Sequence, residues 1–205
     1  MFQWSAIRNH LRDMLPYIRF GFILFFAGII IGGTNTAFES FIQGQMNSLK
    51  QMGDSIEDSS NPTLMFMIII FLNNAVKAIF VMYLGALFGI IPLLFLLVNG
   101  MVVGYLIHHT LMAEGAGYTL DLIVRGLLPH GWIEIPAIVL ACAYGMKFGT
   151  LVLSGLGQVL RRKQGAFASV ESFVVRTIPI MVILVVAMLV ASIIESTLTV
   201  WLISL

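Results

Sequence analysis

Long apolar runs, separated by short polar segments, are the dominant pattern along the chain. The runs occupy residues 20–34, 64–85, 91–109, 131–156 and 177–203. A helix of about 20 apolar residues crosses the hydrocarbon core of a bilayer, whereas strands of an outer-membrane barrel alternate apolar with polar residues, which these runs do not. The pattern predicts an all-α fold: a polytopic transmembrane helical bundle of about five spans, with residues 20–205 as a single transmembrane domain.

Polar and amphipathic segments lie before and between the runs. Residues 1–19 place their apolar side chains on one helical face, which predicts a cytoplasmic interfacial helix ahead of a retained signal anchor. Residues 35–63 form a polar, acidic loop. Residues 118–129 are too short and too charged to cross, so we expect an interfacial or re-entrant segment there. A short amphipathic piece is expected at 166–176, before the last span.

The composition agrees with a membrane protein and excludes some partners. Hydrophobic residues make up 59% of the chain and charged residues 10%, against roughly 45–50% and about 25% in soluble domains. The lipid bilayer is therefore the first expected partner. The formal net charge is only +1 and no long basic stripe is present, so no nucleic acid is expected to bind. The single cysteine, Cys142, excludes an internal disulfide.

The distribution of Lys and Arg predicts an orientation in the cytoplasmic membrane. With the N-terminus inside, the cytoplasmic segments hold Arg8, Arg12, Arg19, Arg161, Arg162, Lys163 and Arg176. The outside loops then hold only Lys50 and Arg125. Because basic residues gather on the cytoplasmic side of membrane proteins, we expect the N-terminus inside and the C-terminus outside.

Six polar side chains interrupt the apolar runs at membrane depth. They are Asn73, Lys77, Asn99, His130, Glu134 and Glu195. A charged side chain at the centre of a span costs about 2.5–3.5 kcal/mol on insertion scales, so one that persists needs a partner or a function. By helical rise, the two amides and the lysine lie near the middle of the membrane, and His130 and Glu134 lie near its outer boundary. We expect all six to face a common interior.

Each of these residues also has a purely structural interpretation. Asn73 and Asn99 are expected to bond each other between helices, a contact that contributes about 0.6–2 kcal/mol. Lys77 either extends to the cytoplasmic face or pairs with Glu195. For Glu134 the structural alternative is a first-turn carboxylate stabilised by the helix dipole, with the histidine before it capping the helix or facing water.

The other interpretation is a metal or proton site. His130 and Glu134 are four residues apart, so they share one helical face and suit two ligands of a divalent metal ion. His108 or His109, together with Glu195, would complete the set, because a zinc site needs three or four ligands. The candidate cofactor is therefore a divalent metal, with His130, Glu134 and His108 as its candidate ligands.

Small residues at four-residue spacing predict where helices touch. The fourth run carries the ladder Ala137, Ala141, Gly145 and Gly149, and the pairs Gly28–Gly32 and Gly100–Gly104 repeat the spacing. Such stripes let helix backbones approach closely. We expect the fourth run to be central in the bundle, and a homodimer to bury such faces if the chain forms a channel.

One segment resembles a known family. Residues Pro129-His130-Gly131-Trp132-Ile133-Glu134-Ile135-Pro136-Ala137 are similar to the signature of the stage II sporulation protein M family. The same pattern is matched by Asn73, Asn99-Gly100, Ala143-x-Gly145-x-x-x-Gly149 and Ile194-Glu195. The resemblance covers most of residues 64–200.

The resemblance implies a protein of the cytoplasmic membrane of a bacterium or archaeon. In spore formers the founding member belongs to a complex with a lytic enzyme and a membrane-anchored amidase-like protein, which together remodel peptidoglycan during engulfment. There it acts as a membrane scaffold, and the family also occurs in organisms that do not sporulate. We therefore expect a scaffold of a peptidoglycan-remodelling complex, with cell-wall lytic enzymes, other membrane proteins and further copies of the chain as partners.

Two other functions stay open. Polar residues at membrane depth favour a channel or transporter for a small solute or ion. An intramembrane metal-dependent enzyme built on His130 and Glu134 ranks third. The zincin His-Glu-x-x-His pattern, a Ser-His-Asp arrangement and phosphate-binding loops are absent from the sequence, so we expect no catalytic residue.

Overall fold

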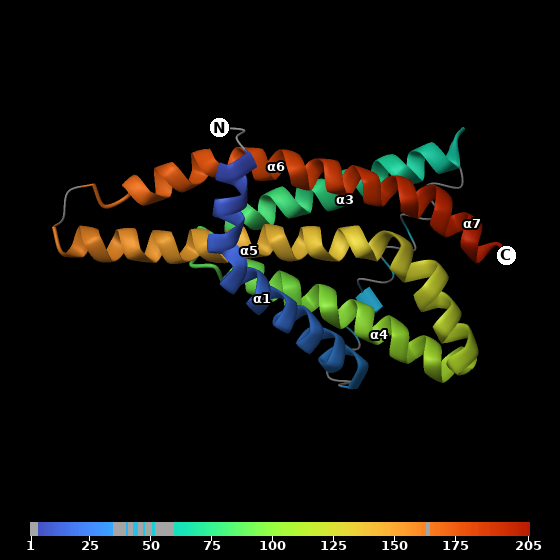
Figure 1. The fold of residues 1–205 in the computed structure, drawn as a ribbon. Helices are drawn as coiled ribbons and strands as arrows, with labels where there is room; N and C mark the ends of the chain where they lie inside the picture. Colours follow the sequence, from blue (N-terminus) through green and yellow to red (C-terminus); the bar gives the residue numbers. More distant parts are fainter. Residues whose placement is uncertain are drawn as a thin grey trace.

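Helices form every regular element in the described part of the chain. The computed structural model describes residues 4–34, 60–162 and 165–205, together with residues 40, 43, 44, 47 and 51. The elements are α1 (Trp4–Thr34), α3 (Pro62–Leu84), α4 (Ile90–Asp121), η2 (Leu122–Leu127), α5 (Leu128–Leu160), α6 (Ala168–Ile194), η3 (Glu195–Thr199) and α7 (Val200–Ile203), where η marks a π-helix. These residues contain no strand (Figure 1), so the predicted all-α class is confirmed.

Four helical stretches are long and apolar enough to cross a bilayer. They are Leu11–Thr34, Pro62–Leu84, Ile90–Leu160 and Ala168–Ile203. The third has 71 residues because α4, η2 and α5 follow one another directly. A straight helix of that length would measure about 105 Å, far more than a bilayer. Figure 1 shows that the stretch instead folds back, so that α4 and α5 lie side by side.

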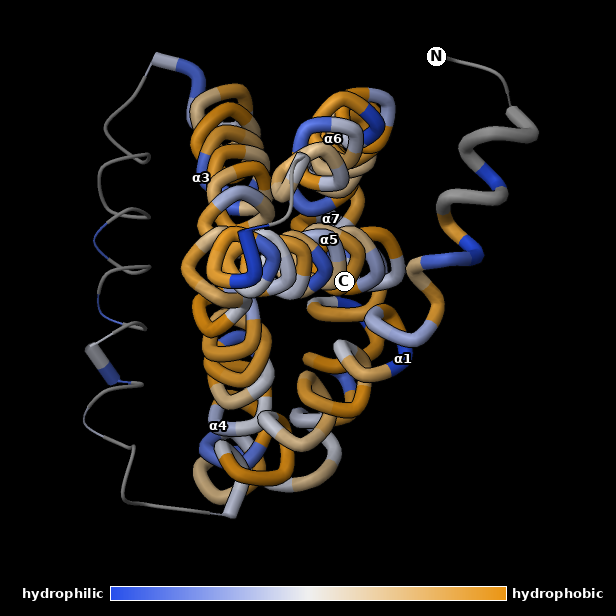
Figure 2. Tube along the Cα trace, turned by 90° about the vertical axis from the view of Figure 1, so that its left-hand side faces the viewer, coloured by the Kyte–Doolittle hydropathy of each residue, from blue (hydrophilic) through white to orange (hydrophobic). Residues whose placement is uncertain are grey.

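The described residues therefore contain five long helices, which are α1, α3, α4, α5 and α6. Large apolar side chains such as Ile30, Phe80 and Val186 point outward with about half or more of their surface exposed. Figure 2 shows that hydrophobic residues dominate all of these helices. The chain is thus built for a lipid environment, and the predicted count of five crossings stays a prediction.

The predicted interfacial segments appear as parts of longer helices. Residues 1–19 fall largely within the first half of α1, which contains Pro16 and changes direction along its length (Figure 1); proline is the usual cause of such a bend. The amphipathic piece expected at 166–176 is continuous with the last long helix: α6 begins at Ala168 and runs through it, because no glycine or proline interrupts residues 168–178. Most of the acidic loop 35–63 lies outside the described residues.

A glycine inside α4 marks the kink at which the chain begins to fold back. Gly115 has φ 82 and ψ 175, a left-handed conformation that side chains with a Cβ rarely adopt. The helical segment after it continues through η2 into α5 and carries an exposed ion pair between Arg125 and Asp121, at 2.8 Å. Residues 118–129, predicted to be interfacial or re-entrant, are helical and connect α4 to α5 through η2.

Glycines hold α1 against α4. A Cβ on Gly28, Gly32, Gly100 or Gly104 would overlap backbone atoms of the facing helix. The two backbones are therefore in direct contact, as the four-residue spacing predicted. These faces are thus covered within one chain, and the expected homodimer stays a prediction.

The helix α5 is the centre of the bundle, as predicted. It contacts α1, α3, α4 and α6, and its residues from Ala141 to Tyr144 have no exposed surface. Gly145 and Gly149 lie against the turn between α3 and α4, where a Cβ on either would overlap backbone or the Pro92 ring. The small residues Gly145 and Gly149 of α5 therefore allow the turn between α3 and α4 to pack closely on this helix.

Two helices extend beyond that turn. The turn packs on α5 around Gly145, Met146 and Gly149. Near this level, Tyr83 of α3 is hydrogen-bonded to Thr177 of α6 at 3.2 Å. Residues 150–162 and 165–176 form this end of the two helices, and Figure 1 shows the last turns of α5 and the first turns of α6 projecting from the bundle. At the base, Phe173 still stacks on Tyr144 and Phe148 of α5. We call residues 150–162 and 165–176 the projecting hairpin. The C-terminus and η2 lie at the opposite end.

Candidate membrane-embedded polar site

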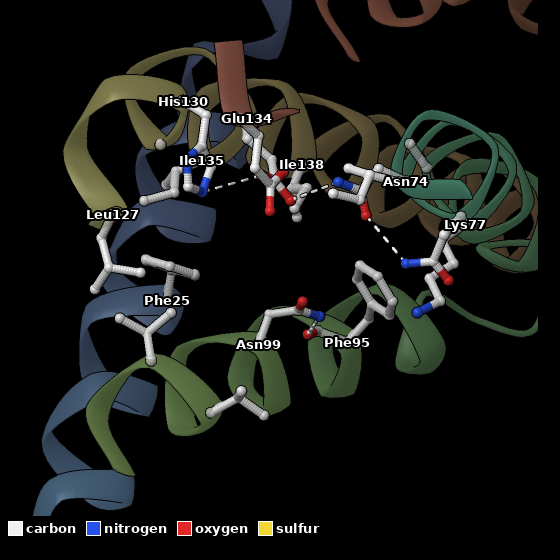
Figure 3. Close-up of a pocket in the computed structure, with 17 residues that line it drawn as sticks. Phe25, Asn74, Lys77, Phe95, Asn99, Leu127, His130, Glu134, Ile135 and Ile138 are labelled. Carbon is white, nitrogen blue, oxygen red and sulfur yellow. Dashed lines mark hydrogen bonds and ion pairs between the residues drawn. The ribbon is translucent and has the colours of Figure 1, made fainter. Parts of the chain in front are cut away.

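A cavity of about 360 Å³ lies inside the bundle. Side chains from α1, α3, α4, α5, η2 and η3 line it, and apolar walls such as Phe25 and Ile138 separate its polar groups (Figure 3). Its polar lining residues are Asn73, Asn74, Lys77, Asn99, His130, Glu134 and Glu195. All six polar residues singled out in the sequence therefore line one cavity, although they come from four different elements. What they do there stays a prediction.

Glu134 is the most firmly positioned of these groups. Its Oε1 accepts a hydrogen bond from Nδ2 of Asn74 on α3, at 3.0 Å. Its Oε2 lies 4.0 Å from Nε2 of His130, one turn earlier on α5. Only 14% of the His130 side chain and 19% of the Glu134 side chain is exposed. The expected shared face of the two residues is present, and it points into the cavity (Figure 3).

Residues of the last helix complete this corner of the cavity. Nδ1 of His130 lies 3.4 Å from Oγ1 of Thr199. One ligand atom each from His130, Glu134 and Glu195 lies within 4.8 Å of the other two. Glu195 begins the π-helical turn η3, and such turns inside α-helices are frequent at functional sites. The histidine and both carboxylates thus form one cluster.

The two asparagines do not bond each other, contrary to the expectation. Nδ2 of Asn99 donates to the carbonyl of Phe95, at 2.7 Å, within its own helix. Nδ2 of Asn73 donates to Oδ1 of Asn74, at 3.2 Å. The cavity lies between α3 and α4 at this level, so each amide finds a partner on its own helix instead.

Lys77 lines the cavity without closing an ion pair. Among the residues that the structure describes, none of the pairs within 4.0 Å joins Lys77 to Glu195. The expected pairing with Glu195 is therefore not formed in this structure. Lys77 is exposed over more than a third of its surface, which leaves its ammonium group free to move toward either the cavity or the bundle surface.

His108 does not join the cluster that the sequence suggested for it. It lies nine residues beyond Asn99 on α4, which is two and a half turns and hence the opposite face of the helix. His108 and His109 are both exposed, and the ring of His109 lies 5.6 Å from that of Tyr105. The third candidate ligand is therefore Glu195, from a helix far along the chain, and not His108.

Two residues of the site were not predicted from the sequence. Asn74 holds Glu134 and Thr199 contacts His130, but neither was singled out. Asn74 follows Asn73 in an otherwise apolar helix, so the pair of adjacent amides was a usable signal. Thr199 lies four residues after Glu195, at the spacing that places two side chains on the same side of a helix.

The cavity is suited to binding a cation or a small polar solute. It holds two carboxyl groups, one ammonium group and one imidazole, and three amides line it as well. Water cannot screen charges well at this depth, so electrostatic interactions in the cavity are stronger than at a protein surface. A positively charged ligand would find both carboxylates within reach of one position.

Comparison with known proteins gives two matches. The family described as Stage II sporulation protein M matches residues 21–200. An uncharacterized protein of Methanocaldococcus jannaschii is 32% identical over 103 residues, which are 50% of this chain and 56% of that protein. The chain thus spans about half the length of this curated relative. No solved structure matches the chain.

Proposed function

Because the chain belongs to the Stage II sporulation protein M family, we propose that this integral membrane protein is a scaffold in a complex that remodels peptidoglycan, either in sporulation or in a related envelope process. The expected partners are cell-wall lytic enzymes and other membrane-anchored proteins. A homo-oligomer is part of the same proposal, and it would use a face other than the glycine stripes. Catalysis by this chain is not part of the proposal.

The projecting hairpin is the observation that supports a scaffold. Its residues on α5 extend about 16 Å beyond the turn that contacts Gly149. At their base, Thr150 lies 3.2 Å from the Tyr17 hydroxyl of α1, and the last turns of α5 project from the bundle beside α6 (Figure 1). Exposed apolar side chains follow this arm, with Leu153 at 49%, Leu156 at 41% and Leu160 at 85% exposure. Apolar surface of this kind suits contact with a membrane or with an apolar segment of a partner.

Basic residues lie next to this apolar surface. Arg161 and Arg162 follow Leu160 directly, and Arg176 lies on the facing part of α6. All three are exposed. Together with the apolar side chains, they suit a membrane-anchored partner whose apolar anchor continues into an acidic segment, because such a partner matches both features.

A co-purification experiment in the native host tests the scaffold proposal. Leu156 and Leu160 would both be changed to Ser, and Met112→Ser with Leu120→Ser would serve as the matched control. The control residues are equally apolar and exposed, at 70% and 64%, but lie on α4 rather than the hairpin. We expect peptidoglycan hydrolases or their membrane anchors to be lost only from the hairpin variant. Exchange of residues 35–63 forms the second arm, and unchanged recovery in both arms would reject the scaffold.

The polar cavity favours a second candidate, a channel or transporter for a small solute or ion. Ionisable residues inside a membrane bundle commonly mark such pathways. Proteoliposomes that contain the purified chain would test it, with Lys77→Met and Glu195→Gln as variants. Solute or ion flux that both variants reduce would support transport, whereas flux no higher than that of empty liposomes would remove this candidate.

A further inference from the structure

We propose that His130, Glu134 and Glu195 bind one divalent transition-metal ion, for which Zn²⁺ is the reference case. The proposal concerns what the cavity binds in the isolated chain. It therefore does not depend on whether the protein recruits envelope enzymes or moves a solute, and it can be tested without a partner or a gradient.

Three ligand atoms are already gathered around one position. They come from α5 and η3, which are some 60 residues apart in sequence, and all lie within 4.8 Å of one another. With metal–ligand bonds of about 2.0–2.2 Å, the ligands of a tetrahedral site lie roughly 3.4 Å apart. The widest pair therefore needs to close by about 1.4 Å on this estimate, and the adjoining cavity gives the side chains room to do so.

Hydrogen bonds orient two of the three ligands toward that position. Thr199 lies at 3.4 Å from Nδ1 of His130, so that Nε2 is the nitrogen that faces Glu134. Asn74 donates to Oε1 of Glu134, which leaves Oε2 available to an ion. Metal-binding histidines and carboxylates are usually held by such partners, which fix the ring orientation and the carboxylate geometry.

The charges in the cavity favour a cation. Ionised Glu134 and Glu195 contribute two negative charges and Lys77 contributes one positive charge, so one negative charge is left over among the described lining residues. An uncompensated charge and two neighbouring carboxylates are both costly in a poorly hydrated interior. A divalent cation would bridge the carboxylates, whereas the competing arrangement is a single proton that they share.

The ligand set selects the class of metal. Mg²⁺ and Ca²⁺ are bound by oxygen atoms, usually six or more. An imidazole nitrogen beside two carboxylates instead suits Zn²⁺, Mn²⁺, Co²⁺ or Fe²⁺. Mg²⁺ is therefore a built-in control for the experiment, since it should not displace Zn²⁺ even in excess.

Metal titration of the tag-free chain in detergent tests the proposal. The chain would be stripped with a chelator, titrated with Zn²⁺ by calorimetry, and analysed for bound metal after gel filtration. We expect one Zn²⁺ per chain, retained in excess Mg²⁺, and a visible absorption spectrum with Co²⁺ whose intensity reports a low coordination number. A rise in the melting temperature with Zn²⁺ should accompany binding, because a ligand that binds only the folded state stabilises it.

Matched variants assign the ligands. Glu195→Gln and Glu134→Gln keep the side-chain size and should weaken Zn²⁺ binding about 100-fold or more, while Asn74→Leu should weaken it about 10- to 100-fold. The matched control is Glu114→Gln, which makes the same change at an exposed position of α4 and should leave the Zn²⁺ affinity unchanged.

Two results would overturn the proposal. One is the absence of stoichiometric Zn²⁺ on the folded wild-type chain, which needs no variant and leaves the shared proton as the explanation of the cluster. The other is equal Zn²⁺ affinity in the wild-type chain and in Glu195→Gln. Neither result bears on the co-purification experiment with the projecting hairpin, so the two proposals can fail separately.

Discussion

Two regions of the bundle differ in how closely their helices pack. The helices α1 and α4 are in direct backbone contact, whereas the helices around the polar cavity are separated. At Gly28, Gly32, Gly100 and Gly104 the side chains are reduced to hydrogen, so that backbone lies on backbone. Around Glu134 the helices stand apart, and long polar side chains reach across the space between them. The contact between α1 and α4 leaves no space between the two backbones, whereas the polar cavity has room for a ligand.

The difference teaches how a small membrane protein can hold polar groups in hydrocarbon. Lipid tails are as apolar as leucine, so apolar contact alone does not drive helices together. Close backbone packing in one part supplies the cohesion, and this allows a less tightly packed part to keep ionisable groups away from lipid. We therefore expect stability to be most sensitive in the glycine contacts and ligand binding to be most sensitive in the cavity.

The largest effect on stability is expected at the glycine contact. A Cβ at Gly104 would overlap the carbonyl of Ile29, so Gly104→Val should destabilise the protein by about 3 kcal/mol or more, at or above the upper end of overpacking effects. Gly157→Val is the matched control, because nothing lies within 4 Å of a Cβ there. Unfolding in mixed detergent micelles, followed by circular dichroism, would measure both, and equal effects would refute a special role for the contact.

The next largest effect is expected in the cavity. Asn74→Leu removes the donor to Glu134 and leaves a buried acceptor without its partner, which should cost about 1–3 kcal/mol. Val76→Leu on the same helix faces outward with 47% exposure and should change stability by less than about 0.5 kcal/mol. The same unfolding assay applies. If Asn74→Leu changed the free energy of unfolding as little as Val76→Leu does, the hydrogen bond from Asn74 to Glu134 would not contribute to stability.

A smaller effect is expected at a polar contact outside the cavity. The hydroxyl of Tyr83 bonds to Thr177 on α6, and both groups are neutral. Tyr83→Phe should therefore destabilise the protein by only about 0.6 kcal/mol, the average for hydrogen bonds between membrane helices. If Tyr83→Phe lost as much stability as Asn74→Leu, the charge of Glu134 would not explain why the cavity hydrogen bond is expected to contribute more.

The smallest effect is expected on the projecting hairpin. Leu160 is 85% exposed, so Leu160→Ser should alter the free energy of unfolding by no more than about 0.5 kcal/mol. The measurement serves as the stability control for the co-purification experiment. A clear destabilisation would mean that this arm packs on the rest of the chain and is not a free docking surface.

Much of the site was visible in the sequence because polar residues are conspicuous in apolar runs. Asn73, Lys77, Asn99, His130, Glu134 and Glu195 were found in this way, and all six line the cavity. The hydrogen-bond partners of these side chains could not be predicted from the sequence. The asparagines bond within α3 and α4 and not to each other, because a hydrogen bond depends on helix separation, which no single run encodes.

By itself, the sequence determined that the chain is an all-helical membrane protein, which residues are too polar for lipid, and that α5 is central through its small-residue ladder. These properties follow from local hydrophobicity and from the fixed spacing of a helix. The tertiary structure alone decided that Glu195 and Thr199 meet His130 while His108 faces away. It also decided that the glycine stripes are used within one chain. Contacts between distant segments depend on how whole helices cross and rotate, and periodicity along a single helix does not contain that information.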